Sequence, residues 1–303
     1  MKLARIYAPL AIALTSLVGC SGGESVTDKD GGVDSGPPPN EIRFDTTSYT
    51  LQPGEEKRYY CFTTRLPADK PTIAEEITPI YGKATHHLAI YYTIQAEPDG
   101  AFDCPQLVKN TWLPLYVGGV ASGSLKAPPG AGFHLFKNQQ LLVQLHLLNA
   151  GAAPVEDKAT IVLKTTDNTN AVPAGIYGFD YRGLNIPAQS QGVIQGMSCP
   201  NMPWDMDVFA VLGHMHQLGK NIDVSRGAQP GDEMLYQAAW NFDDQPTVPK
   251  SLKIKTGDNI HLRCTYDNPG AMDVTYGESS FQEMCAFVFY YTPFKLVNGC
   301  TQP

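Results

Sequence analysis

The sequence predicts an all-β protein, and two features indicate it. Short runs rich in Tyr, Val, Ile, Phe and Leu recur along the 303-residue chain, and stretches of Gly, Pro, Asn and Asp separate them. No stretch shows the apolar periodicity of a long helix. Many short strands between turn residues are typical of antiparallel sandwiches. The clearest predicted strands are Leu88–Ile94, Gln140–Leu148, Thr160–Lys164, Asp207–Leu212, Leu252–Ile254, Ile260–Cys264 and Ala286–Tyr291.

The first forty residues predict export and a lipid anchor. A positively charged start precedes the mostly apolar run Ile6–Val18, which is short for a membrane span but has the length of a secretory signal. The run ends in Leu-Val-Gly-Cys, which resembles the bacterial lipobox, in which Cys20 would be lipidated; an ordinary signal peptide with an unrelated cysteine is the alternative. We expect a signal peptide over 1–20 and a disordered tether over 21–40. The protein would then be held in the cell envelope, at the outer membrane or cell surface, by lipid alone.

Composition indicates which compartment the protein occupies and which partners it does not bind. Thirty acidic residues outnumber twenty-two basic ones, which argues against nucleic acid as a partner. Removing Cys20 leaves an even set of cysteines, which predicts disulfides in an oxidising compartment but allows many pairings. These cysteines are Cys61, Cys104, Cys199, Cys264, Cys285 and Cys300. The polar segment Thr165–Ala174 is the best candidate boundary, so we expect one domain over 41–168 and a second over 169–303.

Histidines form three patterns that could bind a metal. His214 and His216 end a strand-like run, and side chains two residues apart on a strand point to the same face, so both could reach one ion. His86 and His87 are adjacent, and both could bind one ion only where the strand bends or ends. His146 lies in an apolar run, where a hydrogen-bonded core histidine is the common alternative. Each pattern alone is weak evidence for a metal site.

Together the motifs resemble those of the copper type II, ascorbate-dependent monooxygenases, the family of peptidylglycine α-hydroxylating monooxygenase and dopamine β-monooxygenase. The order and separations agree over about residues 42–300. The matching segments are Tyr59–Pro67, Thr85–Leu88, Gln144–His146, Gly213–His216 and Glu283–Cys285. The resemblance implies two antiparallel, jelly-roll-like β-sandwich domains that face each other across an open cleft.

The resemblance also implies two separate copper ions per chain. His86, His87 and His146 would bind the first ion, and His214, His216 and Met284 the second, catalytic one. A thioether is a soft ligand that favours Cu(I), so a set of two imidazoles and one thioether favours copper over zinc. By analogy, the second site would activate the co-substrate O2 and take a hydrogen atom from a substrate C–H bond. The first would deliver an electron, and ascorbate or another one-electron donor would reload both. A core-filling methionine is the alternative interpretation of Met284.

Other residues acquire expected roles from the same resemblance. The implied disulfides are Cys61–Cys104, Cys199–Cys300 and Cys264–Cys285, which use all six remaining cysteines. Tyr59 and Gln144 match residues that line the family's cleft, although a Tyr or Gln on a strand is ordinarily packing. His134 and His261 have no counterpart in the copper set, so we expect them to be structural or surface residues.

Three positions separate this chain from the peptide-amidating members. Those members hold the substrate carboxylate with an arginine, an asparagine and a tyrosine, and this chain carries Leu212, Ala286 and Val288 at the matching positions. Without the guanidinium a charge-assisted contact is lost, so peptide amidation is not expected. We predict a monomeric monooxygenase that hydroxylates a small neutral or apolar molecule. The alternatives are a non-catalytic copper-binding or copper-sensing envelope lipoprotein, and a structural envelope lipoprotein with incidental histidines.

Overall fold

A computed structural model describes residues 40–104, 106–119, 122–296 and 299–302. Within these residues all the regular elements are β-strands, so the all-β prediction is confirmed. None of the described segments is a helix with the length and apolarity needed to cross a bilayer. The predicted signal peptide, Cys20 and all of the tether except Asn40 lie outside the described residues.

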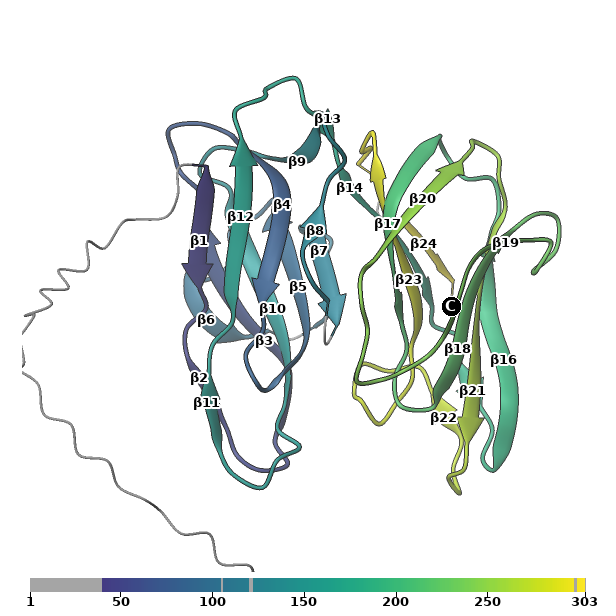
Figure 1. The fold of residues 1–303 in the computed structure, drawn as a ribbon. Helices are drawn as coiled ribbons and strands as arrows, with labels where there is room; N and C mark the ends of the chain where they lie inside the picture. Colours follow the sequence, from purple (N-terminus) through teal and green to yellow (C-terminus); the bar gives the residue numbers. More distant parts are fainter. Residues whose placement is uncertain (1–39, 105, 120–121, 297–298, 303) are drawn as a thin grey trace, which may run out of the picture. The chain divides into compact units, whose positions relative to one another are not determined.

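The strands up to residue 173 form two large sheets and one small one (Figure 1). The first large sheet has the order β1 (Glu41–Asp45), β12 (Thr160–Thr166), β4 (Thr72–Ile80), β9 (Ala131–Leu135) and β13 (Val172–Pro173), and β8 (Leu125–Lys126) pairs with β4. The second has the order β6 (Gly100–Asp103), β3 (Glu56–Arg65), β10 (Gln140–Leu148), β5 (Thr85–Thr93) and β7 (Trp112–Gly119). The small sheet pairs β2 (Tyr49–Leu51) with β11 (Val155–Asp157). We call these strands the early sheets.

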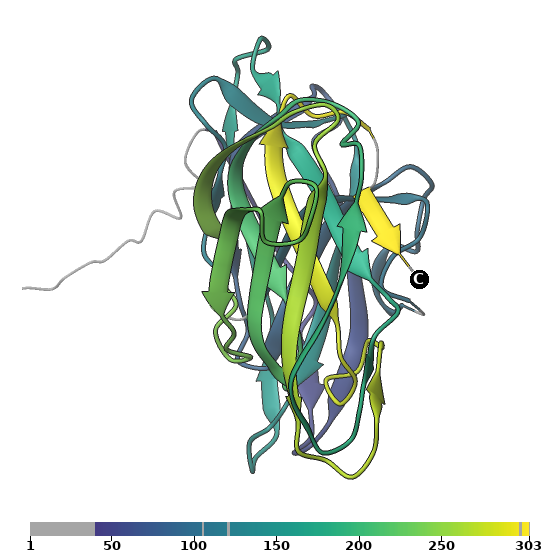
Figure 2. The same ribbon diagram turned by 90° about the vertical axis from the view of Figure 1, so that its right-hand side faces the viewer.

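The strands from residue 175 onward form the later sheets, which Figure 2 shows in green to yellow in front of the early strands. One has the order β20 (Val248–Ile254), β17 (Met206–His214), β23 (Cys285–Thr292), β14 (Gly175–Tyr181) and β24 (Gly299–Gln302). The other has the order β16 (Ser190–Cys199), β21 (Ile260–Asn268), β18 (Gly219–Arg226) and β19 (Glu233–Ala239). A small sheet pairs β15 (Asn185–Ile186) with β22 (Val274–Thr275).

All seven predicted strands overlap observed ones, and Gln140–Leu148 has the same bounds as β10. The predicted boundary segment contains strand structure, because β12 continues to Thr166 and β13 pairs in parallel with β9. Among the described strands, none of the early sheets pairs with a later one. The described residues nevertheless all fall within one compact unit. The division into domains at residues 168 and 169, the jelly-roll-like connectivity and the open cleft therefore stay predictions.

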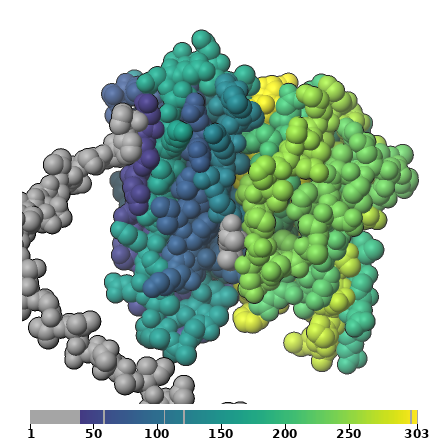
Figure 3. Space-filling model, in the orientation of Figure 1, coloured from purple at the N-terminus to yellow at the C-terminus, as the bar shows by residue number. Residues whose placement is uncertain are grey.

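Two large apolar cores and one small one hold the sheets together, and the first large core extends into the later sheets. The core between the early sheets includes Ile77, Leu88 and Phe133, but it also takes in Leu212 and Tyr290 from β17 and β23. The second core packs residues of the later sheets alone. In Figure 3 the early strands (purple to teal) and the later strands (green to yellow) gather on separate sides of the surface. Apolar burial thus holds β17 and β23 against the early sheets. β17 ends at the predicted ligand His214, and β23 begins directly after the predicted ligand Met284.

A polar contact crosses the same boundary. The Tyr290 hydroxyl donates a hydrogen bond to the Val117 carbonyl oxygen at 2.6 Å and accepts one from the Val117 N–H at 3.0 Å. Tyr290 is fully buried, so its phenol and the β7 backbone satisfy each other away from water.

Three disulfides join elements of the same set of sheets. The pairs are Cys61–Cys104, Cys199–Cys300 and Cys264–Cys285, with Cα–Cα distances of 5.7, 6.1 and 5.9 Å. These distances lie in the ordinary range for disulfides. The pairing implied by the resemblance is confirmed. The last bond fixes β21 to the first residue of β23, directly after Met284.

Candidate metal centre

A β-bulge brings the adjacent histidines to one side of the second early sheet. His87 and His146 are direct cross-strand partners on β5 and β10. The register then shifts, because Leu147 pairs with Thr85, and His86 is the extra residue. A bulge of this kind re-aims the side chain beside it. It supplies the bend that an adjacent histidine pair needs in order to bind a single ion.

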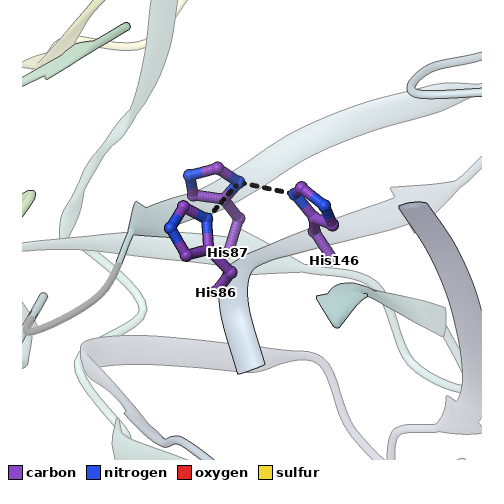
Figure 4. A group of neighbouring side chains, drawn as sticks. All are labelled: His86, His87 and His146. Atoms are coloured by element: carbon purple, nitrogen blue, oxygen red, sulfur yellow. Dashed lines mark hydrogen bonds between the residues drawn. The ribbon is translucent and has the colours of Figure 1, made fainter. Parts of the chain in front are cut away.

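The three early histidines turn their Nδ1 atoms toward one point (Figure 4). His87 Nδ1 lies 3.5 Å from His86 Nδ1 and 3.1 Å from His146 Nδ1. The candidate ligand atoms all lie within 4.8 Å of one another. Two nitrogens that each bind an ion at about 2.0–2.1 Å are roughly 3.3 Å apart at a near-tetrahedral angle. The spacing of this trio therefore fits one metal ion.

The second predicted ligand group lies where β17 ends and β23 begins. His214 is the last residue of β17, and its cross-strand partner on β23 is Ala286. The ring centroids of His214 and His216 are 5.1 Å apart. Met284 precedes β23 directly and lines the same cavity as both of these histidines. The Nδ1 of His216 lies 3.0 Å from the carbonyl oxygen of Gln282, which leaves Nε2 as the nitrogen suited to a metal.

The carboxylate of Glu283 organises the backbone around this second group. It accepts hydrogen bonds from the backbone N–H groups of His216 at 2.8 Å, Leu218 at 2.6 Å and Met284 at 3.3 Å. The side chain is fully buried. Burial outweighs the three donors and raises the pKa of Glu283 to about 7. One side chain thus holds the turn after β17 and the residue before β23 together.

The two histidine groups lie closer together than two sites across an open cleft would require. The ring centroids of His87 and His214 are 4.6 Å apart. The side-chain oxygen of Gln245 lies between them, 3.2 Å from His87 Nε2 and 2.9 Å from His214 Nδ1. The ring of Phe242, from the same loop, packs 4.3 Å from the ring of His86. The loop between β19 and β20 therefore joins the two groups into one cluster.

A glycine makes room for this loop. Gly119 is the cross-strand partner of His87 on β7. A Cβ atom at position 119 would lie 2.5 Å from the Cβ of Gln245, which is far too close for a real contact. The approach of Gln245 to both histidines therefore depends on the absence of a side chain at Gly119.

Electrostatics keep four of the clustered imidazoles neutral, those of His86, His87, His214 and His216. Burial, reinforced by the neighbouring imidazoles, lowers the pKa of His86 and of His214 to about 3 and that of His87 well below its ordinary value. Burial lowers the pKa of His216 to about 4. At neutral pH these rings carry lone pairs rather than an extra proton. Neutral imidazoles are the form that binds a metal.

A cavity of about 410 Å³ opens beside the cluster. Five of the six predicted metal ligands line it, all except His86, and so do all five residues predicted to contact substrate: Tyr59, Gln144, Leu212, Ala286 and Val288. Leu212 and Val288 are cross-strand partners, in line with the pair formed by His214 and Ala286. Because partners on one sheet face share a side, these replacements form an apolar wall next to His214.

Tyr59 and Gln144 line the cavity from β3 and β10 of the early sheets. Burial, with a further contribution from Glu278, raises the pKa of Tyr59 above its ordinary value, so its phenol stays protonated. The amide of Gln144 donates to the carbonyl oxygen of Gln106 at 3.0 Å, and the residue is 3% exposed. Both residues are well packed, and each presents a polar group within a mostly apolar cavity.

The two remaining histidines lie elsewhere, as expected. His134 Nε2 is 2.8 Å from the carbonyl oxygen of Ala171. His261 contacts the Ser198 hydroxyl at 2.7 Å and the Gly227 carbonyl oxygen at 3.0 Å. Neither belongs to a metal-binding group among the described residues.

Sequence reasoning missed several residues of the cluster. Glu56, Phe242 and Gln245 touch the histidines but belong to no recognisable motif in the sequence. Glu283 stood inside a matching segment without an assigned role. Its position directly before Met284 was the one available signal, because a carboxylate beside a ligand often holds neighbouring groups in position.

Comparison with known proteins gives a consistent result. Residues 173–303 match the family described as copper type II ascorbate-dependent monooxygenase, C-terminal domain. Peptidyl-glycine alpha-amidating monooxygenase B of Xenopus laevis is 23% identical over 274 residues, covering 84% of this chain and 30% of the relative. The peptidyl-glycine alpha-amidating monooxygenase of Mus musculus is 23% identical, covering 86% of this chain and 29% of the relative.

A second type of relative also matches. Putative DBH-like monooxygenase protein 2 of Homo sapiens is 24% identical, covering 82% of this chain and 56% of the relative. The chain thus spans less than a third of the length of the peptidyl-glycine relatives that it matches. Among solved structures, a recombinant N-glycanase F covers 86% of this chain with a TM-score of 0.44 and 8% identity, which is too distant to support an inference.

Proposed function

Because the chain belongs to the copper type II, ascorbate-dependent monooxygenase family, we propose that it hydroxylates a C–H bond of a small molecule. The oxidant would be O2, and the reductant a one-electron donor such as ascorbate. Two copper ions per chain would be held by the ligands predicted from the sequence. Copper, when bound, supplies the one-electron redox chemistry and O2 activation that side chains lack.

One observation carries this proposal. A single cavity is lined by two imidazoles and a thioether, by two of the three early histidines, and by an apolar wall. A purely structural protein has no need to gather these groups around one cavity, because every buried imidazole requires a polar partner and an apolar side chain does not. Thioether and imidazole ligands beside a mostly apolar cavity suit a redox-active metal that acts on a bound organic molecule.

The residues of the cavity support a neutral or apolar substrate group. Leu212 and Val288 form the wall nearest His214, and neither can pair with a carboxylate. Removing an apolar surface of this kind from water stabilises a bound apolar group by about 25 cal/mol per Å². A carboxylate at the same place would lose its water shell without a compensating cation. We therefore propose that the reacting carbon belongs to an uncharged part of the substrate.

The protein's own groups would bind, orient and shield the substrate. Tyr59 and Gln144 offer a hydroxyl and an amide in the cavity that Leu212 and Val288 also line. Two polar groups and an apolar wall in one cavity can orient a molecule that carries one polar substituent. Gln245 and Glu56 would keep the ligand imidazoles in place.

Copper stoichiometry tests the ligand sets. We expect about two ions per purified wild-type chain, and about one in each of the Met284→Ala and His87→Ala variants. A His261→Ala variant is the matched control, because that histidine lies outside the cluster, and it should retain both ions. Wild-type protein that binds no copper at low micromolar concentration would refute the proposal.

Turnover separates an enzyme from a copper-binding protein without catalysis. The enzyme consumes O2 and ascorbate in the presence of a panel of small apolar molecules and releases a hydroxylated product. Tight binding of two copper ions with no product from any donor or substrate class would favour the copper-binding or copper-sensing alternative.

We also propose, from the sequence alone, that Cys20 carries a lipid that holds a monomeric protein at the cell envelope. Cys20→Ala should release the protein from the membrane fraction while leaving copper binding unchanged. A variant that stays in the membrane fraction would contradict lipid anchorage through this residue.

A further inference from the structure

A carboxylate of the early sheets connects the first histidine group with the turn that leads to Met284. Glu56 is the first residue of β3 and is 16% exposed. Its Oε1 lies 2.9 Å from His146 Nε2 and accepts hydrogen bonds from Ser280, at 2.9 Å from the hydroxyl and 3.3 Å from the backbone N–H. Its Oε2 accepts a hydrogen bond from the Ser279 hydroxyl at 3.3 Å. One side chain of the early sheets thus contacts the loop between β22 (Val274–Thr275) and β23 (Cys285–Thr292).

The contact with His146 selects the nitrogen that faces the metal position. A carboxylate accepts but does not donate, so the proton of the His146 ring is held on Nε2. The other nitrogen, Nδ1, then carries the lone pair and points toward His87 Nδ1, 3.1 Å away. A carboxylate that holds a ligand histidine in this way fixes both its tautomer and its orientation.

The contact with the serines holds the segment that ends in Met284. Ser280 is 2% exposed and lies four residues before the methionine. Gln282, between them, donates its backbone N–H to the Ser279 carbonyl oxygen at 2.8 Å, and its own carbonyl oxygen faces His216 Nδ1. Movement of the two serines would therefore displace ligands of the second group as well.

We propose that Glu56 is a positioning residue that couples the two metal sites, through the His146 ring on one side and the Ser279–Ser280 turn on the other. The inference rests on the proposed function, since it requires both sites to bind copper. Occupancy of the first site tightens the second, because an ordered His146 ring holds Glu56 in the position that the serine hydroxyls need. This coupling is reciprocal: a metal in the second site also favours binding in the first.

The test is a stepwise titration of full-length protein with Cu(I) against a competing chelator, combined with Cu(II) electron paramagnetic resonance of each site. Glu56→Gln preserves shape but replaces one acceptor oxygen by a donor. We expect about a 10- to 100-fold loss of affinity at the first site, the usual effect of removing an outer partner of a ligand, and a weaker second site. Ser280→Ala is a milder change. It should leave the copper affinity of the first site within about threefold of wild type and lower that of the second site about three- to tenfold.

Asp223→Asn is the matched control, because Asp223 is a buried carboxylate in an ion pair with Arg263, in the sheet that contains β18, and does not touch the histidines. It should change neither affinity. If wild type binds two ions and both affinities of Glu56→Gln stay within about threefold, the coupling is refuted while the proposed function stands. If Glu56→Gln does not fold, an unchanged second site in Ser280→Ala refutes it instead. Wild type that binds no copper overturns the proposed function and this inference together.

Discussion

The buried carboxylate of Glu283 makes a measurable prediction about pH and stability. Its ordinary pKa of 4.5 is raised to about 7 by burial. A group whose pKa is higher in the folded state stabilises that state at low pH, and the stabilisation disappears as the pH rises through the folded-state value. From these two values, protonation of Glu283 contributes about 2.5 kcal/mol at pH 5 and almost nothing at pH 8.

Glu283→Gln removes this titration while keeping the size of the side chain. The amide can accept only at its oxygen, so one of the two short bonds to His216 and Leu218 is lost, at a cost of about 1–3 kcal/mol at either pH. The stability of wild type relative to this variant should therefore fall by about 2.5 kcal/mol between pH 5 and pH 8. Other titrating groups are common to both proteins and cancel in this difference.

Urea unfolding of both proteins at the two pH values, with copper removed by a chelator, measures this change. Equal slopes of free energy against denaturant would show that the unfolded states are comparable. A difference between the two proteins that stays constant from pH 5 to pH 8 would falsify the argument that burial keeps this carboxyl group protonated.

Four further predictions follow from the boundary between the sheets and from the cavity. Tyr290→Phe leaves the Val117 N–H without its partner, so we expect the unfolding free energy to fall by about 1–3 kcal/mol. A fall below about 0.5 kcal/mol, which is typical of a surface substitution, would contradict this. The copper affinity of the second ligand group should change less than about threefold from pH 7 to pH 5, because the lowered pKa values of His214 and His216 keep protons from competing. With histidines of ordinary pKa, copper affinity would fall about 25-fold per ligand over this range, and a fall of tenfold or more is the contrary result. Leu212→Arg should lower the unfolding free energy by about 3–5 kcal/mol by burying an unpaired charge, whereas Leu212→Met should cost less than about 1.5 kcal/mol. Peptides that end in glycine should not be hydroxylated by wild type, and product detected by mass spectrometry would overturn the apolar-wall argument.

The sequence predicts the strands well because their signal is local. The run Gln140–Leu148 has the bounds of β10, since its apolar residues and flanking polar turns both lie within a few positions. The pair His86–His87 could bind a single ion only if the strand bends there, and the bulge on β5 supplies that bend. Patterns that occupy one stretch of chain can be interpreted without the fold.

The partners that position the ligands could not be predicted, because their contacts join distant segments. Glu56 reaches Ser280 across 224 positions, and Gln245 reaches His87 across 158. Neither residue lies in an unusual local sequence, since a glutamate near a strand start and a glutamine in a loop are ordinary surface choices. Their significance follows from the pairing of sheets, which a single sequence does not reveal. The closeness of the two histidine groups escaped prediction for the same reason.

The phenol that joins β23 to β7 has a consequence for self-association. β7 is the last strand of its sheet, and the outward N–H and C=O groups of such a strand invite another chain to add alongside. Tyr290 occupies both groups of Val117, so an incoming strand cannot pair there without first expelling a buried ring. The protection exists only after the later sheets have docked. A newly made chain is therefore most exposed to aggregation in the interval between formation of the early sheets and arrival of β23.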